Sequence, residues 1–116
     1  MKEKRDIILY IGDIIEAINE VEEYVSEIAD AEALANDKKT YRAVLMNFII
    51  IGEAVRNIYE QVRENHPEVE WKDVMSMRNK LTHEYFGVDN QVVWDSIKNN
   101  LPELREIIMR IKKGLQ

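Results

Sequence analysis

Residues 43–52, AVLMNFIIIG, form the stretch that decides the fold, because Asn47 is the one polar side chain between Ala43 and Ile51. At about 3.6 residues per turn, a helix built from this run has apolar side chains on nearly every side. Such a helix must be covered all round, and in a domain of this size one neighbouring helix cannot do so. We therefore predict a four-helix arrangement. The apolar surface of this helix can be buried in two ways, either by a core within one chain or by an additional interface with a second copy.

Apolar residues in the rest of the chain recur every three or four positions, a spacing typical of amphipathic helices. This spacing predicts helices over about residues 5–33, over 38–65, from Trp71 to Thr82 or His83, after Asp89 through Ile97, and over 103–113. The sequence contains no internal repeat and no linker. We predict a single all-α domain over residues 1–116, an up-and-down bundle of four to five helices.

Individual residues mark where these helices begin and end. Residues 36–37, Asn-Asp, are suited to cap the second helix, and Asp89 the fourth, because their side chains accept hydrogen bonds from first-turn N–H groups. Pro67 ends the second helix, and Gly87 ends the third. Pro102 is expected to force a kink or a restart.

The composition narrows the class of protein. Hydrophobic residues make up 46% of the chain and charged residues 33%, which suits a compact helical domain. The chain has no cysteine, which excludes a disulfide framework and thiolate metal sites and agrees with a reducing, cytoplasmic location. The amino-terminal residues do not resemble a signal peptide, and the densest apolar run is far shorter than the ~20 residues of a membrane span.

A second stretch, residues 77–87 (MRNKLTHEYFG), carries the candidate functional residues Arg78, His83 and Tyr85. On an ideal helix, five residues turn roughly 140° about the axis, so Arg78 and His83 would point apart. Arg78 and Tyr85, seven residues apart, would share a face. Arg78 and His83 can therefore meet at one ligand if the helix loosens near His83 or if a second chain completes the site.

These residue types suit phosphodiester chemistry. Histidine exchanges protons near neutral pH, and the arginine fork matches a pair of phosphate oxygens. In RNA, a histidine could deprotonate the 2′-OH for attack on the adjacent phosphorus, while an arginine stabilises the charge on the phosphoryl oxygens. This route needs no metal ion, yields a 2′,3′-cyclic phosphate and a 5′-OH, and cannot cut DNA, which lacks the nucleophile.

Other patterns in the sequence limit the alternatives. The net charge of −6 argues against non-specific coating of nucleic acid but leaves room for a local basic site. The two histidines, His66 and His83, have no metal-site spacing around them, and the four glycines are isolated, so we expect no metal and no cofactor held by a phosphate loop. On side-chain chemistry alone, a purely structural role stays open, in which Arg78 pairs with an acid and Tyr85 fills the core.

The motif and its surroundings resemble the HEPN-domain proteins, specifically the HepT-like branch, whose motif is Arg, four residues, His, any residue, Tyr. Arg78, His83 and Tyr85 occupy these three positions without departure. The similarity extends over nearly the whole chain and is carried by RDIILYIGDIIEAI, IIGEAVRNI, HPEVEWKDVMSMRN and VVWDSIKNNLPEL, besides RNKLTHEYFGVD.

The resemblance implies an all-α homodimer, with room for a higher assembly, in which the motifs of two subunits share one cleft. It implies a ribonuclease toxin of a toxin–antitoxin pair with Arg78 and His83 as catalytic residues. It also implies a partner, a small MntA-type nucleotidyltransferase that silences the nuclease by attaching AMP to Tyr85.

Three further residues are expected to support this site. Glu53 belongs to a Gly-Glu pair that the family carries in its second helix, so the resemblance implies that it orients Arg78 or Asn79. Asn79 and Lys80 lie beside the motif and could contact the RNA backbone. The alternative function is a non-catalytic subunit that binds a nucleotide, or presents a substrate, for a separate nucleotidyltransferase.

Overall fold

The computed structural model describes residues 3–83 and 88–116, and every regular element in this part of the chain is a helix. The elements are, in order, α1 (Lys4–Tyr24), α2 (Ala31–Asn36), α3 (Lys38–Val62), α4 (Trp71–His83), α5 (Asn90–Asp95), the π-helical segment η2 (Ser96–Asn100) and α6 (Leu101–Leu115). The helical turns of α5, η2 and α6 follow one another without a gap. The all-α prediction is confirmed.

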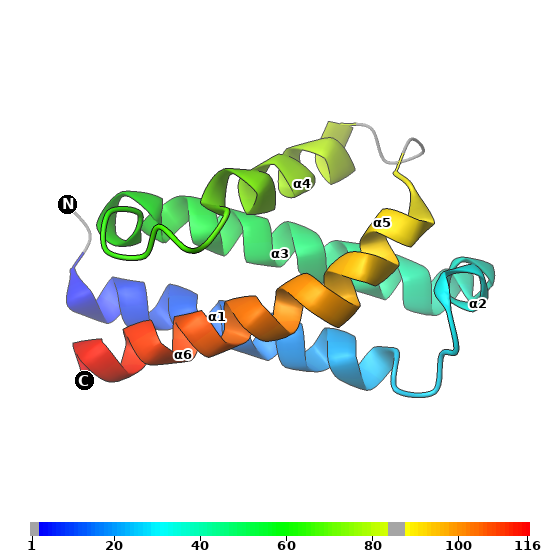
Figure 1. The fold of residues 1–116 in the computed structure, drawn as a ribbon, viewed down its shortest axis with the longest axis horizontal. Coiled ribbons are helices and arrows are strands. Elements are labelled where there is room, and N and C mark those ends of the chain that lie inside the picture. Colours follow the sequence, from blue (N-terminus) through cyan, green and yellow to red (C-terminus); the bar gives the residue numbers. More distant parts are fainter. Residues whose placement is uncertain (1–2, 84–87) are drawn as a thin grey trace.

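The long helices form an up-and-down bundle, as predicted. α1, α3, α4 and the α5–η2–α6 run alternate in direction, and α1 begins at the same end of the bundle at which α6 finishes (Figure 1). α3 packs on α1 on one side and on α4 on another, while α6 packs on α1. The short α2 lies at the far end beside α5, where the Asn90 side chain donates to the Ala31 carbonyl at 3.3 Å.

The core fills the space between α1, α3 and α6. Burial of each large aliphatic side chain stabilises the fold by about 1.5–3 kcal/mol. The side chains that are essentially inaccessible to solvent include Ile11, Ile14, Ile18 and Val21 of α1, Val44, Ile51, Val55 and Ile58 of α3, and Ile108 of α6.

Two helix starts follow from carboxylate caps that the sequence predicted. Asp37 accepts a hydrogen bond from the Thr40 N–H at 3.1 Å, and Asp89 accepts one from the Gln91 N–H at 2.8 Å. The third helix also has its predicted bounds, and its first residue, Trp71, donates from its indole to the His66 carbonyl at 2.8 Å. Gly87, expected to end that helix, lies outside the described residues.

The predicted helix over residues 5–33 is wrong in its last third. α1 ends at Tyr24, and Asp30 starts the separate helix α2 by accepting from the Ala33 N–H at 2.9 Å. The apolar spacing continues across this break because Val25 and Ile28 still pack on the core from the connecting turn. The second helix is also shorter than predicted, since α3 ends at Val62 and a turn leads on to Pro67.

The restart expected at Pro102 is present, although no gap opens: α6 begins at Leu101, and Pro102 stands in its first turn. Proline has no N–H, and in an α-helix its ring collides with the carbonyl four residues earlier. Here the turn before it is widened: the Leu101 N–H bonds to Ser96, five residues back, in a π-helical turn. Pro102 is therefore accommodated in the helical run, which continues to Leu115.

The apolar helix α3 is not fully covered within one chain. Asn47 is buried and its amide donates to the Ala43 carbonyl at 3.1 Å, so its polar group is satisfied inside the helix. Met46 and Ile50, however, are 57% and 40% exposed. Part of the apolar surface of residues 43–52 is thus exposed to solvent in the described chain. Its burial in an interface with a second copy stays a prediction.

Gly52 lets α3 and α4 approach closely. A Cβ atom placed on Gly52 would lie 2.2 Å from Cβ of Arg78 and 3.3 Å from the Val74 carbonyl oxygen. Both neighbours belong to the body of α4, so a side chain at this position could not be accommodated by a rotamer change alone. The absence of a side chain at residue 52 therefore sets the distance between the two helices.

We expect Gly52→Ala to destabilise the fold by about 1–3 kcal/mol, because the added methyl group overpacks the α3–α4 contact. Gly12→Ala is the matched control: Gly12 is also helical, but a Cβ atom on it would have no neighbour within 4 Å. There the change should stabilise by about 0.5–1 kcal/mol, as alanine is the better helix former. Urea unfolding of both variants gives the comparison, and equal stabilisation by the two would contradict the close contact.

Candidate functional site

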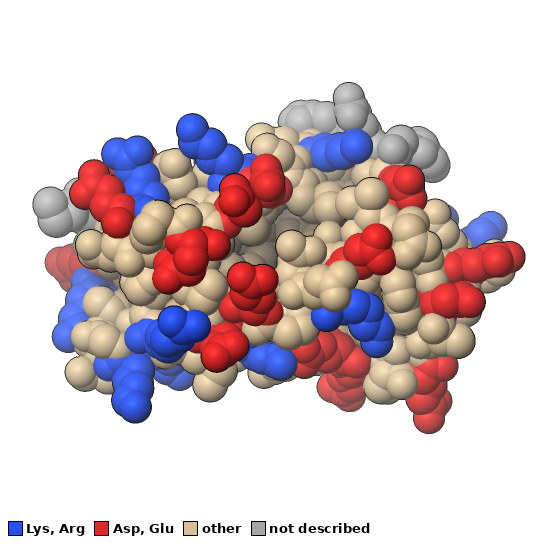
Figure 2. Space-filling model, in the orientation of Figure 1, with Lys and Arg blue, Asp and Glu red and all other residues tan. Residues whose placement is uncertain are grey.

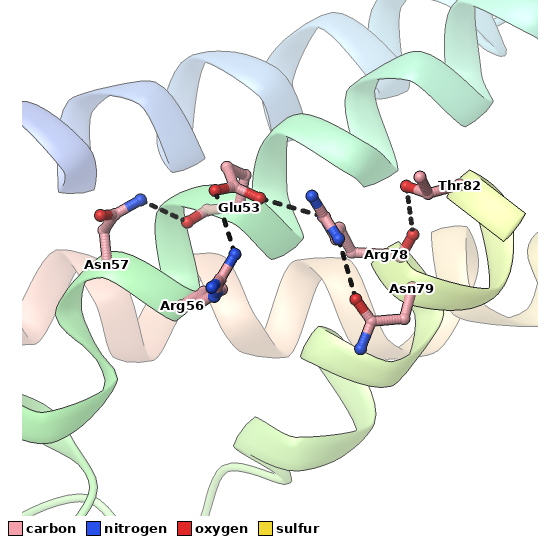
Figure 3. A network of polar contacts seen from close by, with 6 residues as sticks. All are labelled: Glu53, Arg56, Asn57, Arg78, Asn79 and Thr82. Carbon is pink, nitrogen blue, oxygen red and sulfur yellow. Dashed lines mark hydrogen bonds and ion pairs between the residues drawn. The ribbon is translucent and has the colours of Figure 1, made fainter.

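Arg78 and Glu53 form the centre of a polar site where α4 crosses α3 (Figure 3). Because Gly52 has no side chain, Arg78 lies against α3 and reaches the next residue, with 3.0 Å between its Nε and the Glu53 Oε2. The Arg78 side chain is 24% exposed and that of Glu53 44%. The pair is therefore buried at the contact and open to solvent at its outer side.

A small network extends from this ion pair (Figure 3). Asn79 accepts a hydrogen bond from Nη1 of Arg78 at 2.9 Å, so the guanidinium is held by two neighbours. Glu53 also pairs with the exposed Arg56 at 3.7 Å. The Thr82 hydroxyl and the Asn57 amide bond to the backbone carbonyls of Arg78 and Glu53, each at 2.9 Å.

The two atoms of the ion pair are shielded from water. Nε of Arg78 and Oε2 of Glu53 have almost no accessible surface, and within the described residues neither has a hydrogen-bond partner of good geometry. Shielding from water strengthens the attraction between opposite charges. Their contact therefore acts chiefly as a charge pair that restricts where the guanidinium can go.

The other predicted site residues lie along the same helix or just beyond it. Lys80 is exposed on α4, as is Asn79, whose side chain is directed to Arg78. His83 is the last residue of α4, but its side chain and the whole of Tyr85 lie outside the described residues. Convergence of Arg78 and His83 on one ligand therefore stays a prediction.

Glu53 contacts Arg78, one of the two residues that it was expected to orient, and it also pairs with Arg56. Asn57 and Thr82 were missed, although each lies four residues after a site residue, the spacing at which helical side chains reach a preceding carbonyl. Gly52 was missed as a determinant of the site. The signal in the sequence is a glycine inside a predicted helix. Glycine destabilises a helix by about 1 kcal/mol relative to alanine, so its presence there indicates a close packing contact.

Among residues 3–83 and 88–116, no three His, Cys, Asp or Glu side chains are placed to hold a metal ion together. No helix in this same part of the chain has both the length and the apolar character to cross a membrane.

Comparison with known proteins places the chain in a family. The family model described as "Ribonuclease HepT-like" matches residues 14–111. The chain is 42% identical over 104 residues to "Probable ribonuclease HepT" of Thermococcus cleftensis, covering 90% of this chain and 94% of that protein. It is 35% identical over 113 residues to "Putative RNase MJ0127" of Methanocaldococcus jannaschii, covering 94% and 93%. No solved structure matches. The chain belongs to the HepT-like ribonuclease family, a branch of the HEPN proteins.

Proposed function

We propose that this chain is a metal-independent endoribonuclease in which Arg78 and His83 carry the chemistry. The observation that supports this most directly is the arginine of the motif, fixed by Glu53 and Asn79 and still partly open to solvent. An arginine restrained in this way can meet a phosphate without first losing much side-chain freedom. The relatives named as ribonucleases point to RNA as the substrate.

The reaction needs no group beyond these side chains and the RNA itself. His83 removes the proton from a 2′-OH, and the oxygen attacks the adjacent phosphorus while Arg78 stabilises the charge on the phosphoryl oxygens. The bond to the 5′ oxygen breaks, and that oxygen takes a proton from an imidazolium. A 2′,3′-cyclic phosphate and a 5′-OH remain.

The active form in this proposal is a homodimer with the two motifs in one cleft. Met46 lies four residues before Ile50, and Ile50 lies three residues before Glu53. The exposed apolar side chains therefore continue along the face of α3 that holds the site. A second copy packed on this face would cover them and bring its own motif close. His83 of the partner subunit would then be available to protonate the leaving oxygen.

The regulatory part of the proposal concerns Tyr85. A partner nucleotidyltransferase of the MntA type would attach AMP to its hydroxyl, so that the chain acts as a toxin and the partner as its antitoxin. Each adenylate adds a phosphate charge and a base beside Arg78 and His83. The phosphate would offset the positive field, and the base would occupy the path of the RNA.

We expect the purified protein to cut RNA in the presence of EDTA, and Arg78→Ala or His83→Ala to lower the rate at least about 100-fold. Glu53→Gln should give a smaller loss, because it loosens Arg78 without removing it. Cleavage is followed on labelled RNA, with end-group analysis for the cyclic phosphate, and an all-DNA strand of the same sequence should stay intact.

Arg63→Ala is the matched control, since Arg63 is an exposed arginine of the same fold that pairs with Glu60 at 3.4 Å, away from the motif. Its rate should equal that of the unaltered protein, and circular dichroism should show all variants folded. Undiminished cleavage by folded His83→Ala would overturn the catalytic assignment. Nucleotide binding without any cleavage would favour the non-catalytic alternative.

Dimer formation has its own test. We expect Ile50→Glu to yield a monomer that no longer cuts RNA, because the charge would be buried in the proposed interface. Leu9→Glu is the control: Leu9 is an exposed apolar residue on α1, and its replacement should leave the dimer intact. Sedimentation analysis gives the masses, and a dimer that survives Ile50→Glu would exclude this face of α3.

Regulation by Tyr85 is tested by co-expression with an MntA-type nucleotidyltransferase. The intact mass of the chain should rise by whole AMP units, and cleavage of RNA should fall in parallel. Tyr85→Phe should keep the unmodified mass, as should the native chain beside a partner that lacks its own catalytic carboxylates. An AMP shift that persists in Tyr85→Phe would reject this residue as the acceptor.

A further inference from the structure

A groove lies on the other side of α4 from Arg78, between α4 and the α5–η2–α6 run. It encloses about 330 Å³, and its floor consists of buried apolar side chains from α3 and α6. The floor residues are Phe48, Ile51, Leu101, Leu104 and Ile107. Val74 and Met77 of α4 line one wall, and the half-exposed Val92 belongs to the other. The groove thus offers an apolar surface that reaches the solvent.

The rim of the groove is acidic. Four carboxylates surround the apolar floor: Glu68, Glu70, Asp73 and Glu103. Figure 2 shows the hollow on the face of the molecule with acidic side chains around it. None of the described residues that line the groove is a lysine or an arginine. A ligand with positive charges is favoured here, whereas the phosphates of RNA are repelled.

α4 separates this groove from the polar site. Met77 lines the groove, and the next residue, Arg78, is turned about 100° around the helix axis to face Gly52 and Glu53 of α3. Asp73 and Val74 lie one turn earlier on the groove side. The groove is therefore not part of the site proposed for RNA cleavage.

The shape of the groove suits an elongated occupant. α4 packs chiefly on α3, so the slot beside α6 stays open. Its second wall is one stripe of residues at steps of three or four, which spans roughly 20 Å at 1.5 Å per residue. That stripe is Val92, Ser96, Asn100 and Glu103; it runs through the π-helical segment and ends at the floor residue Ile107. Such segments are frequent at functional sites.

We propose that this groove binds a cationic amphipathic helix of a partner protein. The apolar face of that helix lies on the floor residues, and its lysines or arginines pair with the carboxylates of the rim, as in helix-in-groove recognition. The homodimer proposed above uses the face of α3 around Met46 and Ile50 instead, and a chain with a net charge of −6 offers the acidic rim fewer cations than a basic segment does. The occupant is thus a different, basic protein segment.

The test uses a synthetic amphipathic peptide of about 14 residues, four helical turns, made of leucine and lysine, and a second peptide with glutamate at every lysine position. Each is titrated into the ¹⁵N-labelled full chain at about 0.15 M salt, where the attraction between distant surface charges is screened. The lysine peptide should bind and shift the amide signals of Val74, Met77 and Val92. The glutamate peptide should not bind.

Two triple variants separate the groove from general attraction to an acidic protein. In the first, Glu68, Glu70 and Asp73 become lysine; in the second, the exposed α1 residues Asp13, Glu16 and Glu23 become lysine. The change in net charge is the same. We expect the first to weaken binding of the lysine peptide at least tenfold, or about 1.4 kcal/mol, and the second less than twofold.

Four outcomes would overturn the proposal. The first is equal weakening by the two triple variants, and the second is amide shifts that centre away from the groove. The third is an unaltered affinity in Val92→Asp, which places a charge at an apolar position of the second wall and serves as a further variant if the first triple fails to fold. A change of oligomeric state in the first triple variant would assign the groove to a second copy instead.

Discussion

The contact between Gly52 and Arg78 is the constraint on which the functional surface depends. A helix normally presents a side chain at every position, and those side chains hold neighbouring helices about 8–10 Å apart. Gly52 has no side chain, so α4 packs closely against α3 at this position. The Arg78 side chain then extends along the α3 surface to Glu53. A single missing Cβ thereby positions an arginine that is held at one edge and open at the other.

The same contact gives α4 two distinct sides. One carries the ion pair and adjoins the face of α3 where Met46 and Ile50 are exposed. The other forms the wall of an apolar groove with an acidic rim. These surfaces suit different ligands, since a restrained arginine attracts phosphate and a carboxylate rim repels it. The two proposals accordingly assign a phosphate to the first side of α4 and a basic partner to the second, in a chain with a net charge of −6.

Sequence reasoning succeeded where local chemistry decides the structure. Asp37 and Asp89 cap helices because a carboxylate satisfies first-turn N–H groups in almost any context. It failed at residues 25–30, where Val25 and Ile28 keep the apolar spacing of a helix although the chain turns there. At Pro102 it expected a kink or a restart, and α6 does restart at Leu101, directly after a π-helical turn. The error at residues 25–30 came from a local rule that the packing of the whole bundle overrode.

The sequence by itself determined the all-α class, the alternation of the long helices, the motif residues and the family, because apolar spacing, caps and motif spacing are properties of the chain alone. Only the tertiary structure decided which acid meets Arg78, where the apolar surface of α3 stays open, and that a groove lies behind α4. These depend on distances between helices far apart in sequence. Such distances are set by how side chains, or their absence at Gly52, fit together in three dimensions.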